Sequence, residues 1–271
     1  MTDIQSYLQA YDHQLRTDAE TPSALSVTTL GPLRLVTFAG GRGFITYQDL
    51  AGACAAEING LVEEALAHFV ADASISDVEW KTRGHDRAPG LHEALLANGF
   101  VAGEPESIMV GPLEGLCNGV TTPDGVTLRK VTSEDDVRAM SAMADEAFGE
   151  STNTRTADAL LARLARNDGM ELWVAEVDGR MVSAGRLEPV PDTDFVGIWG
   201  GATLTEFRKR GIYRALTAER ARSALAMGKK YVHSDSTEFS RPILERSGLV
   251  KVSTTTPVSY THLTLPTNRE V

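Results

Sequence analysis

The stretch that decides the fold of this chain reads Ala202-Thr203-Leu204-Thr205-Glu206-Phe207-Arg208-Lys209-Arg210-Gly211-Ile212-Tyr213-Arg214. An apolar, strand-like run ends here, a basic turn with one glycine follows, and a long helical pattern begins at once. The first turn of a helix has unpaired N–H groups and a partial positive charge of about 0.5, so it attracts anions. Gly211 lets a bulky group approach the backbone. The chemistry predicts a diphosphate site, for which coenzyme A is one of several ligands; a solvated basic helix start is the structural alternative.

The segments around this stretch alternate between strand and helix patterns. Between residues 119 and 258, strands are expected at 126–131, 171–177, 180–187, 195–204 and 230–234, and helices at 133–148, 156–167, 210–227 and 240–247. Asp178-Gly179 is a strong signal for a two-residue hairpin. This order predicts an α/β fold in which helices cover both faces of a mixed sheet.

The basic stretch and its surroundings resemble the GNAT (GCN5-related N-acetyltransferase) superfamily. Its acyl-CoA-binding motif is Arg/Gln-x-x-Gly-x-Gly/Ala at the start of the central helix. Arg208, Gly211 and Tyr213 fall at the three marked positions, and Tyr213 departs from the expected Gly or Ala. The order of elements from about residue 119 to residue 258 is also similar. The resemblance implies the GNAT acyl-CoA N-acyltransferase fold for this half.

The first half of the chain repeats part of this pattern. A strand at 76–81, a Pro-started helix at 89–98 and an extended run to Val110 follow a long helix predicted at 49–71. That long helix lacks basic residues and the Arg-x-x-Gly pattern, and Gly40-Gly41-Arg42-Gly43 precedes a strand, which makes it a weak phosphate loop. We therefore expect two GNAT-like units in tandem. Residues 1–118 would be a degenerate unit without cofactor binding, and residues 119–258 the N-acetyltransferase domain.

The resemblance also implies a reaction and a binding site. Acetyl-CoA would be the cosubstrate, and its acetyl group would move to a primary amine of a small molecule by direct attack in a ternary complex. The strand end should present backbone groups to the thioester and the pantetheine arm, and the amides of the following loop should hold the pyrophosphate. The expected cofactor-binding residues are Gly201, Ala202, Thr203, Arg208, Lys209, Arg210, Gly211, Ile212, Tyr213 and Arg214.

The residues for proton transfer depart from those of better-known family members. The strand position that often carries a glutamate base corresponds to Gly197, and the position of the tyrosine that often protonates the thiolate corresponds to Leu244. Glu188 and Asp235, both at strand ends, are the candidate catalytic residues. His233 lies two residues before Asp235, so the two side chains are expected on the same face of the strand. The simpler interpretation of His233 is a packed core or surface residue. Positioning alone, with water carrying the proton, is a further route.

The acceptor is not identified by the sequence. Trp173, Phe195 and Trp199, with the polar loop 149–154, are candidates for shaping its pocket, although core packing is the simpler interpretation for Trp173. Two other functions stay open. The missing acid and base favour a non-catalytic acyl-CoA-binding or regulatory module, and a protein N-acetyltransferase acting on lysine or amino-terminal amines is the third hypothesis.

The charge of the chain excludes one class of partner. The formal net charge is −11, and the first 118 residues hold 6 Lys and Arg against 16 Asp and Glu, a net charge of −10. Nucleic-acid binding depends on basic contacts to phosphates, so we expect no nucleic-acid partner. An acidic surface attracts cations such as an amine. The alternative is that the acidic surface only keeps the protein soluble. A homodimer is compatible with this composition.

Compartment and metal chemistry follow from what the sequence lacks. Cys54 and Cys117 are isolated, which is typical of ordinary thiols rather than a disulfide or a metal site. The apolar runs are shorter than the ~18 residues of a membrane-spanning helix. The start, Met1-Thr2-Asp3-Ile4-Gln5, does not look like a signal peptide. We expect a cytoplasmic protein with no metal and no membrane association.

The end of the chain has a different character. Residues 259–267, Ser259-Tyr260-Thr261-His262-Leu263-Thr264-Leu265-Pro266-Thr267, resemble the translation of a common sequencing adapter. We therefore expect residues 259–271 to be a non-native tail that replaces the natural carboxy terminus, and we leave them out of the fold prediction.

Overall fold

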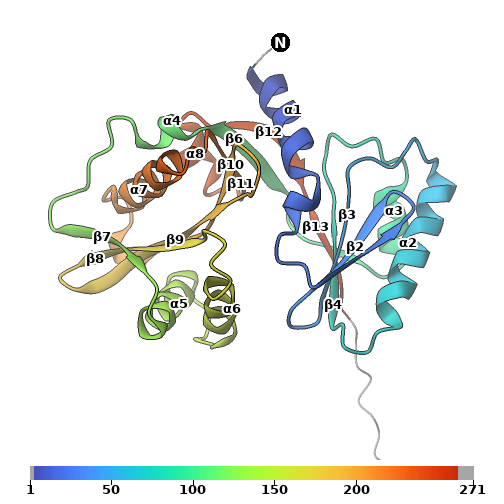
Figure 1. Ribbon diagram of the computed structural model, residues 1–271, viewed down its shortest axis with the longest axis horizontal. Coiled ribbons are helices and arrows are strands. Elements are labelled where there is room, and N and C mark those ends of the chain that lie inside the picture. The colour runs from blue at the N-terminus through green and yellow to red at the C-terminus, as the bar shows by residue number, and fades with distance from the viewer. Residues whose placement is uncertain (1–2, 262–271) are drawn as a thin grey trace, which may run out of the picture. The chain divides into compact units, whose positions relative to one another are not determined.

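The computed structural model describes residues 3–261, which form two compact units (Figure 1). One unit takes in the chain up to Leu8 together with Met109–Val252, and the other takes in Gln9–Ile108 together with the chain from Ser253 onward. Each unit has its own β-sheet. The chain therefore changes units at 108/109 and 252/253, and not at the expected domain boundaries of 118/119 and 258/259.

The unit that contains residues 109–252 has a seven-stranded sheet in the order β12-β6-β11-β10-β9-β8-β7. Figure 1 shows α5 and α6 on one face of this sheet and α7 on the other, which confirms the predicted mixed α/β architecture. Its strands are β6 (Glu106–Pro112), β7 (Val126–Val131), β8 (Glu171–Val177), β9 (Arg180–Pro189), β10 (Phe195–Thr203), β11 (Tyr231–Ser236) and β12 (Val250–Thr255). Its helices are α4 (Leu113–Cys117), α5 (Glu134–Phe148), α6 (Arg155–Leu164), α7 (Ile212–Ala226) and α8 (Arg241–Glu245).

Local chemistry fixes the ends of several of these elements. Ser133 caps α5, because its side chain accepts a hydrogen bond from the Asp136 N–H, and Gly149 ends the helix with a φ of 73°. Asp178 and Gly179 have φ values of 50° and 77°. Positive φ at both central residues is the requirement of a tight hairpin turn, and it joins β8 to β9 as predicted.

Where the structure has β6 and α4, the sequence predicts only an extended run to Val110 and no helix. A Cβ on Gly111 would lie 2.8 Å from the Leu249 Cα, and one on Gly115 would lie 2.5 Å from the Ser247 oxygen. These glycines thus permit close packing of β6 and α4 against the chain around residue 248. The strand β6 lies between β12 and β11, so it belongs to the seven-stranded sheet. The boundary between the two units therefore lies at 108/109, before the expected boundary at 118/119.

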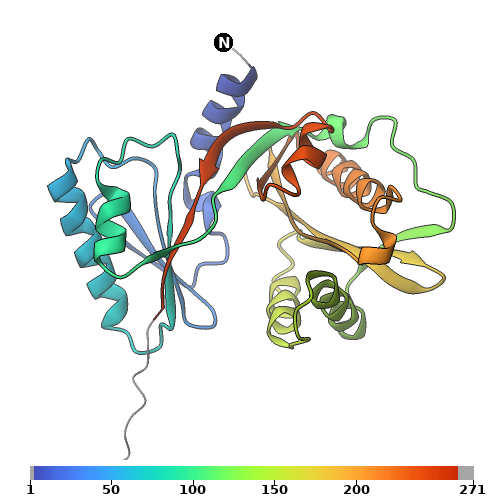
Figure 2. The ribbon, with the colours of Figure 1, turned by 180° about the vertical axis from the view of Figure 1, so that it is seen from behind.

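The other unit has a six-stranded sheet in the order β1-β2-β3-β4-β13-β5, and α2 and α3 pack side by side against it (Figures 1 and 2). Its core includes the fully buried side chains of Tyr47, Ile58, Phe69 and Trp80. The strands are β1 (Ser26–Leu30), β2 (Leu33–Phe38), β3 (Arg42–Tyr47), β4 (Asp77–Lys81), β5 (Val101–Ala102) and β13 (Pro257–Thr261). The helices are α2 (Ala55–Val70) and α3 (Leu91–Ala97), while α1 (Asp3–Leu15) begins the described chain.

The strand β13 crosses the point at which the expected non-native tail begins. Ser259, Tyr260 and Thr261 pair with β4, and the Tyr260 ring lies 5.6 Å from the Phe100 ring. These three residues belong to the fold, so leaving them out of the prediction missed a strand between β4 and β5. The rest of the expected tail, 262–271, lies outside the described residues.

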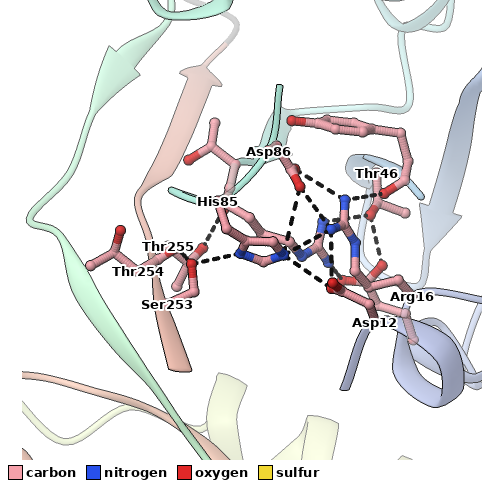
Figure 3. Close-up of polar contacts among 12 residues, drawn as sticks. Asp12, Arg16, Thr46, His85, Asp86, Ser253, Thr254 and Thr255 are labelled. Atoms are coloured by element: carbon pink, nitrogen blue, oxygen red, sulfur yellow. Dashed lines mark hydrogen bonds and ion pairs between the residues drawn. The ribbon is translucent and has the colours of Figure 1, made fainter. Parts of the chain in front are cut away.

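A polar cluster is buried in the second unit (Figure 3). The Arg16 guanidinium donates to both carboxylate oxygens of Asp86, at 2.7 and 3.0 Å, and to the Tyr47 carbonyl. His85 lies beside this pair. Its Nε2 is 3.0 Å from the Asp12 Oδ1, and its Nδ1 is 2.6 Å from the Ser253 hydroxyl.

Among residues 3–261, no helix combines the length and the apolar character that crossing a bilayer requires.

Candidate functional site

The two central strands of the seven-stranded sheet part from each other. Parallel pairing of β10 with β11 covers only Phe195–Gly197 against Tyr231–His233, although β10 continues to Thr203 and β11 to Ser236. Beyond the paired part, the Ser234 hydroxyl donates to the Ile198 carbonyl over 3.1 Å. The far part of β10 therefore has an edge whose peptide groups are not used in a ladder with β11.

A bulge lies in β10 at the same place. On the β9 side, Trp199 pairs with Arg186 and Ala202 pairs with Ala184, so Gly200 and Gly201 have no register partner. Gly200 has a φ of 60°, which side chains disfavour. Such bulges turn backbone groups out of the sheet. The bulge thus presents peptide groups beside the parted strands.

The chain then forms an open helix amino terminus. After the short 3-10 turn η2 (Thr205–Phe207), Lys209 and Gly211 take positive φ values of 63° and 79°, and α7 begins at Ile212. The first helical hydrogen bond runs from the Ala215 N–H to the Gly211 carbonyl. No side chain caps this helix, and its first turn has no acidic residue. Its leading N–H groups are available to an anion.

The basic side chains of this loop divide into two roles. Arg208 donates to the Thr203 carbonyl at 3.0 Å and to the Ala147 carbonyl at 2.8 Å, so it holds the loop against β10 and α5. The Arg210 guanidinium lies 5.0 Å from the centre of the Phe207 ring. Lys209, Arg210 and Arg214 are exposed. The mobile positive charge comes from these three residues, while Arg208 acts by positioning.

The corresponding long helix of the other unit, α2, is closed. The Glu57 carboxylate accepts a hydrogen bond from the Cys54 N–H at 2.8 Å, in a capping box. These hydrogen bonds lower the pKa of Glu57, which keeps it ionised. The end of α2 is thus occupied by the chain's own anion, whereas the end of α7 is open.

One face of the parted strands carries polar and aromatic side chains. Gly197 pairs with Glu188 on one side and with His233 on the other, so both side chains project to the same face. The Trp199 indole folds over Gly197: a Cβ there would lie 2.2 Å from Nε1. The His233 ring meets Trp199 edge-on at 5.3 Å. This face is the one covered by α5 and α6.

Comparison with known proteins agrees with this geometry. Residues 137–248 match the model of the acetyltransferase (GNAT) family. This part of the chain is a GNAT domain. It contains the parted strands, the bulge and the open end of α7 described above. No curated protein matches the sequence significantly.

Solved structures extend the likeness to nearly the whole chain. A GCN5-related N-acetyltransferase from Kribbella flavida is 19% identical, with a TM-score of 0.65 over 97% of this chain and 98% of that chain. One from Sphaerobacter thermophilus is 17% identical, with a TM-score of 0.62 over 84% and 76%. A tandem GNAT protein from the clavulanic acid biosynthesis pathway is 13% identical, with a TM-score of 0.59 over 96% of both chains. The shared fold and the two sheets fit a tandem arrangement.

The GNAT domain places the two predicted catalytic carboxylates in different surroundings. Glu188 lies 3.6 Å from an Arg163 nitrogen and 3.5 Å from an Arg186 nitrogen, and its side chain is 21% exposed. Asp235 is half-buried on β11, past the last residue paired with β10. Glu188 is on β9, so β10 separates the two strands that carry the carboxylates.

The three aromatic residues considered for the acceptor pocket have different positions in the GNAT domain. Trp173 pairs with Gly185, on the α7 face, and its indole N–H donates to the Glu171 carboxylate at 2.8 Å. It is a buried core residue, which agrees with the simpler interpretation given above. Phe195 is fully buried, and only Trp199 is partly exposed.

The GNAT domain contains a buried arginine that was not predicted. Arg220 has no exposed surface, and its guanidinium lies against Gly185, where a Cβ would be 2.4 Å from Nη1. The Tyr213 ring is 5.9 Å away, and its hydroxyl fills the space over Gly201. The only sequence signal is the pair of glycines inside strands, which mark a close approach. Within residues 3–261, no three His, Cys, Asp or Glu side chains form a metal-binding group.

Proposed function

We propose that the GNAT domain is an acyl-CoA-dependent N-acetyltransferase. It would move the acetyl group of acetyl-CoA to a primary amine of a small molecule by direct attack in a ternary complex. The observation that carries the proposal is the uncapped amino terminus of α7, which lies where β10 leaves its pairing with β11. An anion site and a gap between strands at one place suit a ligand with a diphosphate and a long arm.

The diphosphate would be held mainly by backbone. The N–H groups from Gly211 to Arg214 precede the first helical hydrogen bond, and the exposed side chains of Lys209 and Arg210 flank them. Charge-assisted hydrogen bonds of this kind contribute about 1.5–3 kcal/mol each. Ile212 and Ala202 are buried, so they would contribute peptide groups alone.

The thioester would lie at the bulge. Gly200 and Gly201 have no register partner on β9. A peptide N–H directed at the carbonyl oxygen stabilises the charge that develops there when the amine attacks. Gly201 is exposed and lacks a side chain, so a substrate can approach the backbone closely.

The amine must lose a proton, and the carboxylates differ in how well they suit this. Two arginines lie against Glu188 and tie its side chain in place. Asp235 is on the face of His233 and Trp199, beyond the paired part of β11. We therefore propose Asp235 as the first candidate base and Glu188 as the second. A positioned base contributes about 10²–10⁴-fold to rate.

A second function has specific support. The Trp199 indole occupies the space that a longer side chain at position 197 would need, and Leu244 is buried and apolar. These two positions often carry the base and the acid in the better-known members of the family that the sequence resembles. A GNAT domain that binds acyl-CoA without transfer would also fit them. Thiol release from acetyl-CoA with a panel of primary amines distinguishes the two, because only the enzyme gives turnover.

Calorimetric titration of acetyl-CoA into the full chain tests the binding site. The variant Arg210→Glu/Gly211→Asp places two carboxylates at the open helix end, and we expect it to lose at least about 100-fold in affinity, from two charge-assisted contacts. Lys251→Glu, which reverses an exposed charge on β12, is the control and should bind like the parent. A folded parent that does not bind acetyl-CoA would overturn the proposal.

A further inference from the structure

We infer that the amine acceptor carries a carboxylate close to its amine, and that the Arg186 guanidinium binds this carboxylate. The inference rests on the proposed function, because it names the class of acceptor that the GNAT domain would use. It arises from three features that meet at one place in the sheet: a half-exposed guanidinium, the bulge of β10 beside it, and carboxylates on the same face.

Arg186 lies on β9 at the point where the bulge of β10 begins. It is the register partner of Trp199, after which Gly200 and Gly201 have no partner. Cross-strand partners project to the same face, so the Arg186 side chain lies on the face of Trp199. A Cβ on Gly200 would lie 3.6 Å from the Arg186 Nε and 3.9 Å from its Cγ. The arginine side chain therefore lies against the bulge, where the thioester is proposed to bind.

The Arg186 guanidinium is engaged by the protein at one end only. Its one ion-pair partner among residues 3–261 is Glu188, whose Oε1 lies 3.5 Å from the Arg186 Nε. That nitrogen is buried and makes no hydrogen bond, and the hydrogen bonds of the described residues do not use the two terminal nitrogens. The side chain is 32% exposed. Two strong donors therefore remain for a small anion that reaches the bulge.

The guanidinium is held in place from two directions. The Arg186 carbonyl accepts a hydrogen bond of 3.0 Å from Arg220, which is fully buried on the opposite face of the sheet. Glu188, which lies against the Nε, is in turn 3.6 Å from an Arg163 nitrogen. A donor group that is already oriented loses less conformational freedom when a ligand binds. This arrangement suits recognition of an anion better than a freely moving surface arginine would.

Carboxylates lie on the same face, on either side of β10. Gly197 is the register partner of both Glu188 and His233, so these two side chains share the face of Trp199. Asp235 is two residues beyond His233 on β11 and projects to that face as well. A cation at the bulge and carboxylates on the neighbouring strands match the two opposite charges of an amino acid.

The position of the guanidinium also limits the spacing of those charges. The acceptor nitrogen must reach the thioester at the bulge, and Arg186 lies against that bulge at Gly200. Only a few bonds can therefore separate the carboxylate from the nitrogen, as in an α-amino acid. A planar guanidinium binds a carboxylate through two parallel hydrogen bonds, whereas a carboxamide offers one acceptor oxygen and an NH₂ group that is itself a donor. Arg186 would bind and orient the acceptor and would take no part in proton transfer.

Acetylation of matched amines by the full chain tests the inference. The panel is alanine, leucine, phenylalanine and lysine, each beside its carboxamide and its decarboxylated amine, with thiol release from acetyl-CoA as the readout. In Arg186→Gln we expect kcat/KM for the acids to fall by about 10–100-fold, from the loss of a charge-assisted contact. The values for the carboxamides and the KM for acetyl-CoA should stay as in the parent. Comparing the ratio of acid to carboxamide between variants cancels the different basicities of the amines.

Two other variants complete the test. Arg180→Gln is the matched control, because it changes a 52% exposed arginine of the same strand that pairs with Glu146 and Glu206, and it should keep the ratio of the parent. Arg186→Lys should keep part of the preference for acids, because the charge remains while the two-pronged geometry is lost. If Arg186→Gln does not fold, the fall of the ratio in Arg186→Lys decides.

The outcomes separate the inference from the proposed function. Equal ratios in the parent and in the Arg186 variants would overturn the inference and leave the proposed function intact. A parent that binds acetyl-CoA but acetylates no amino acid would also overturn the inference. A parent that does not bind acetyl-CoA would overturn both.

Discussion

Removing the Asp86 carboxylate should strongly destabilise the unit that contains residues 9–108. The Arg16 and Asp86 side chains are 3% and 7% exposed and share two hydrogen bonds of 2.7 and 3.0 Å. At an effective dielectric constant of about 20 and a charge separation of about 4 Å, their attraction is about 4 kcal/mol. Asp86→Asn removes the bidentate partner of the buried guanidinium and leaves it only the Asp12 carboxylate, at 3.2 Å. Breaking a buried ion pair typically costs about 3–5 kcal/mol, and with Asp12 still in place we expect the lower part of that range. This is a large part of the roughly 5–15 kcal/mol that stabilises a domain.

Urea denaturation followed by circular dichroism measures this loss, and hydrogen exchange assigns it to a unit, because two units need not unfold together. Asp18→Asn is the matched control: Asp18 pairs with Arg34, but its side chain is 90% exposed, so the loss should stay below about 1 kcal/mol. Arg16→Met/Asp86→Leu should recover part of the loss, because it also removes the buried guanidinium that has lost its bidentate partner. Equal losses in Asp86→Asn and Asp18→Asn would refute the reasoning.

Three further changes follow from single contacts. Ser133→Ala removes the cap of α5 and should lower the free energy of unfolding of the GNAT domain by about 1 kcal/mol in urea titration. Gly197→Ala puts a Cβ 2.2 Å from the Trp199 indole nitrogen, so we expect a shifted tryptophan emission spectrum and a lower melting temperature. The pKa of Asp12 is lowered: burial alone would raise it, but the hydrogen bond and charge of His85, with Arg16, outweigh burial. Its contribution to stability is therefore present above about pH 4 and lost as pH falls through the folded-state pKa.

Each of these has its own control. Ser151→Ala, in an exposed loop, should leave the unfolding free energy of the GNAT domain unchanged. Adding Trp199→Leu to Gly197→Ala should restore the melting temperature, because it removes the clash; no restoration would argue against that contact. Asp12→Asn should flatten the acid limb of the stability curve, and an unchanged limb would contradict the assignment to Asp12.

Local patterns predicted the local parts of this fold well. The hairpin of β8 and β9 was located to within two residues, because alternation and the Asp178-Gly179 turn depend only on neighbours in sequence. The long helix predicted from residue 49 begins only at Ala55, because Ala51 and Gly52 take φ values of 54° and 76°. Helical periodicity does not report such a turn.

Features that depend on contacts between distant parts of the chain could not be predicted from the sequence. Nothing in the composition of β6 or β13 states which sheet each will join, because an extended segment with few charges can pair with many edges. In the candidate site, the motif identified the open end of α7, whose geometry is local. The burial of Arg220 was not predicted, because arginine is ordinarily a surface residue and the glycine that admits it, Gly185, is far away in sequence.

The strand β13 has a consequence for how the protein is made. It is the fifth of six strands in its sheet, flanked by β4 and β5, yet it comes last among the described elements. During synthesis, the first hundred residues emerge long before this strand. Until it arrives, β4 and β5 expose unpaired backbone edges of the kind that promote association between nascent chains. The first sheet to be translated is therefore the last to close, and a chain that is truncated before residue 257 has an open sheet.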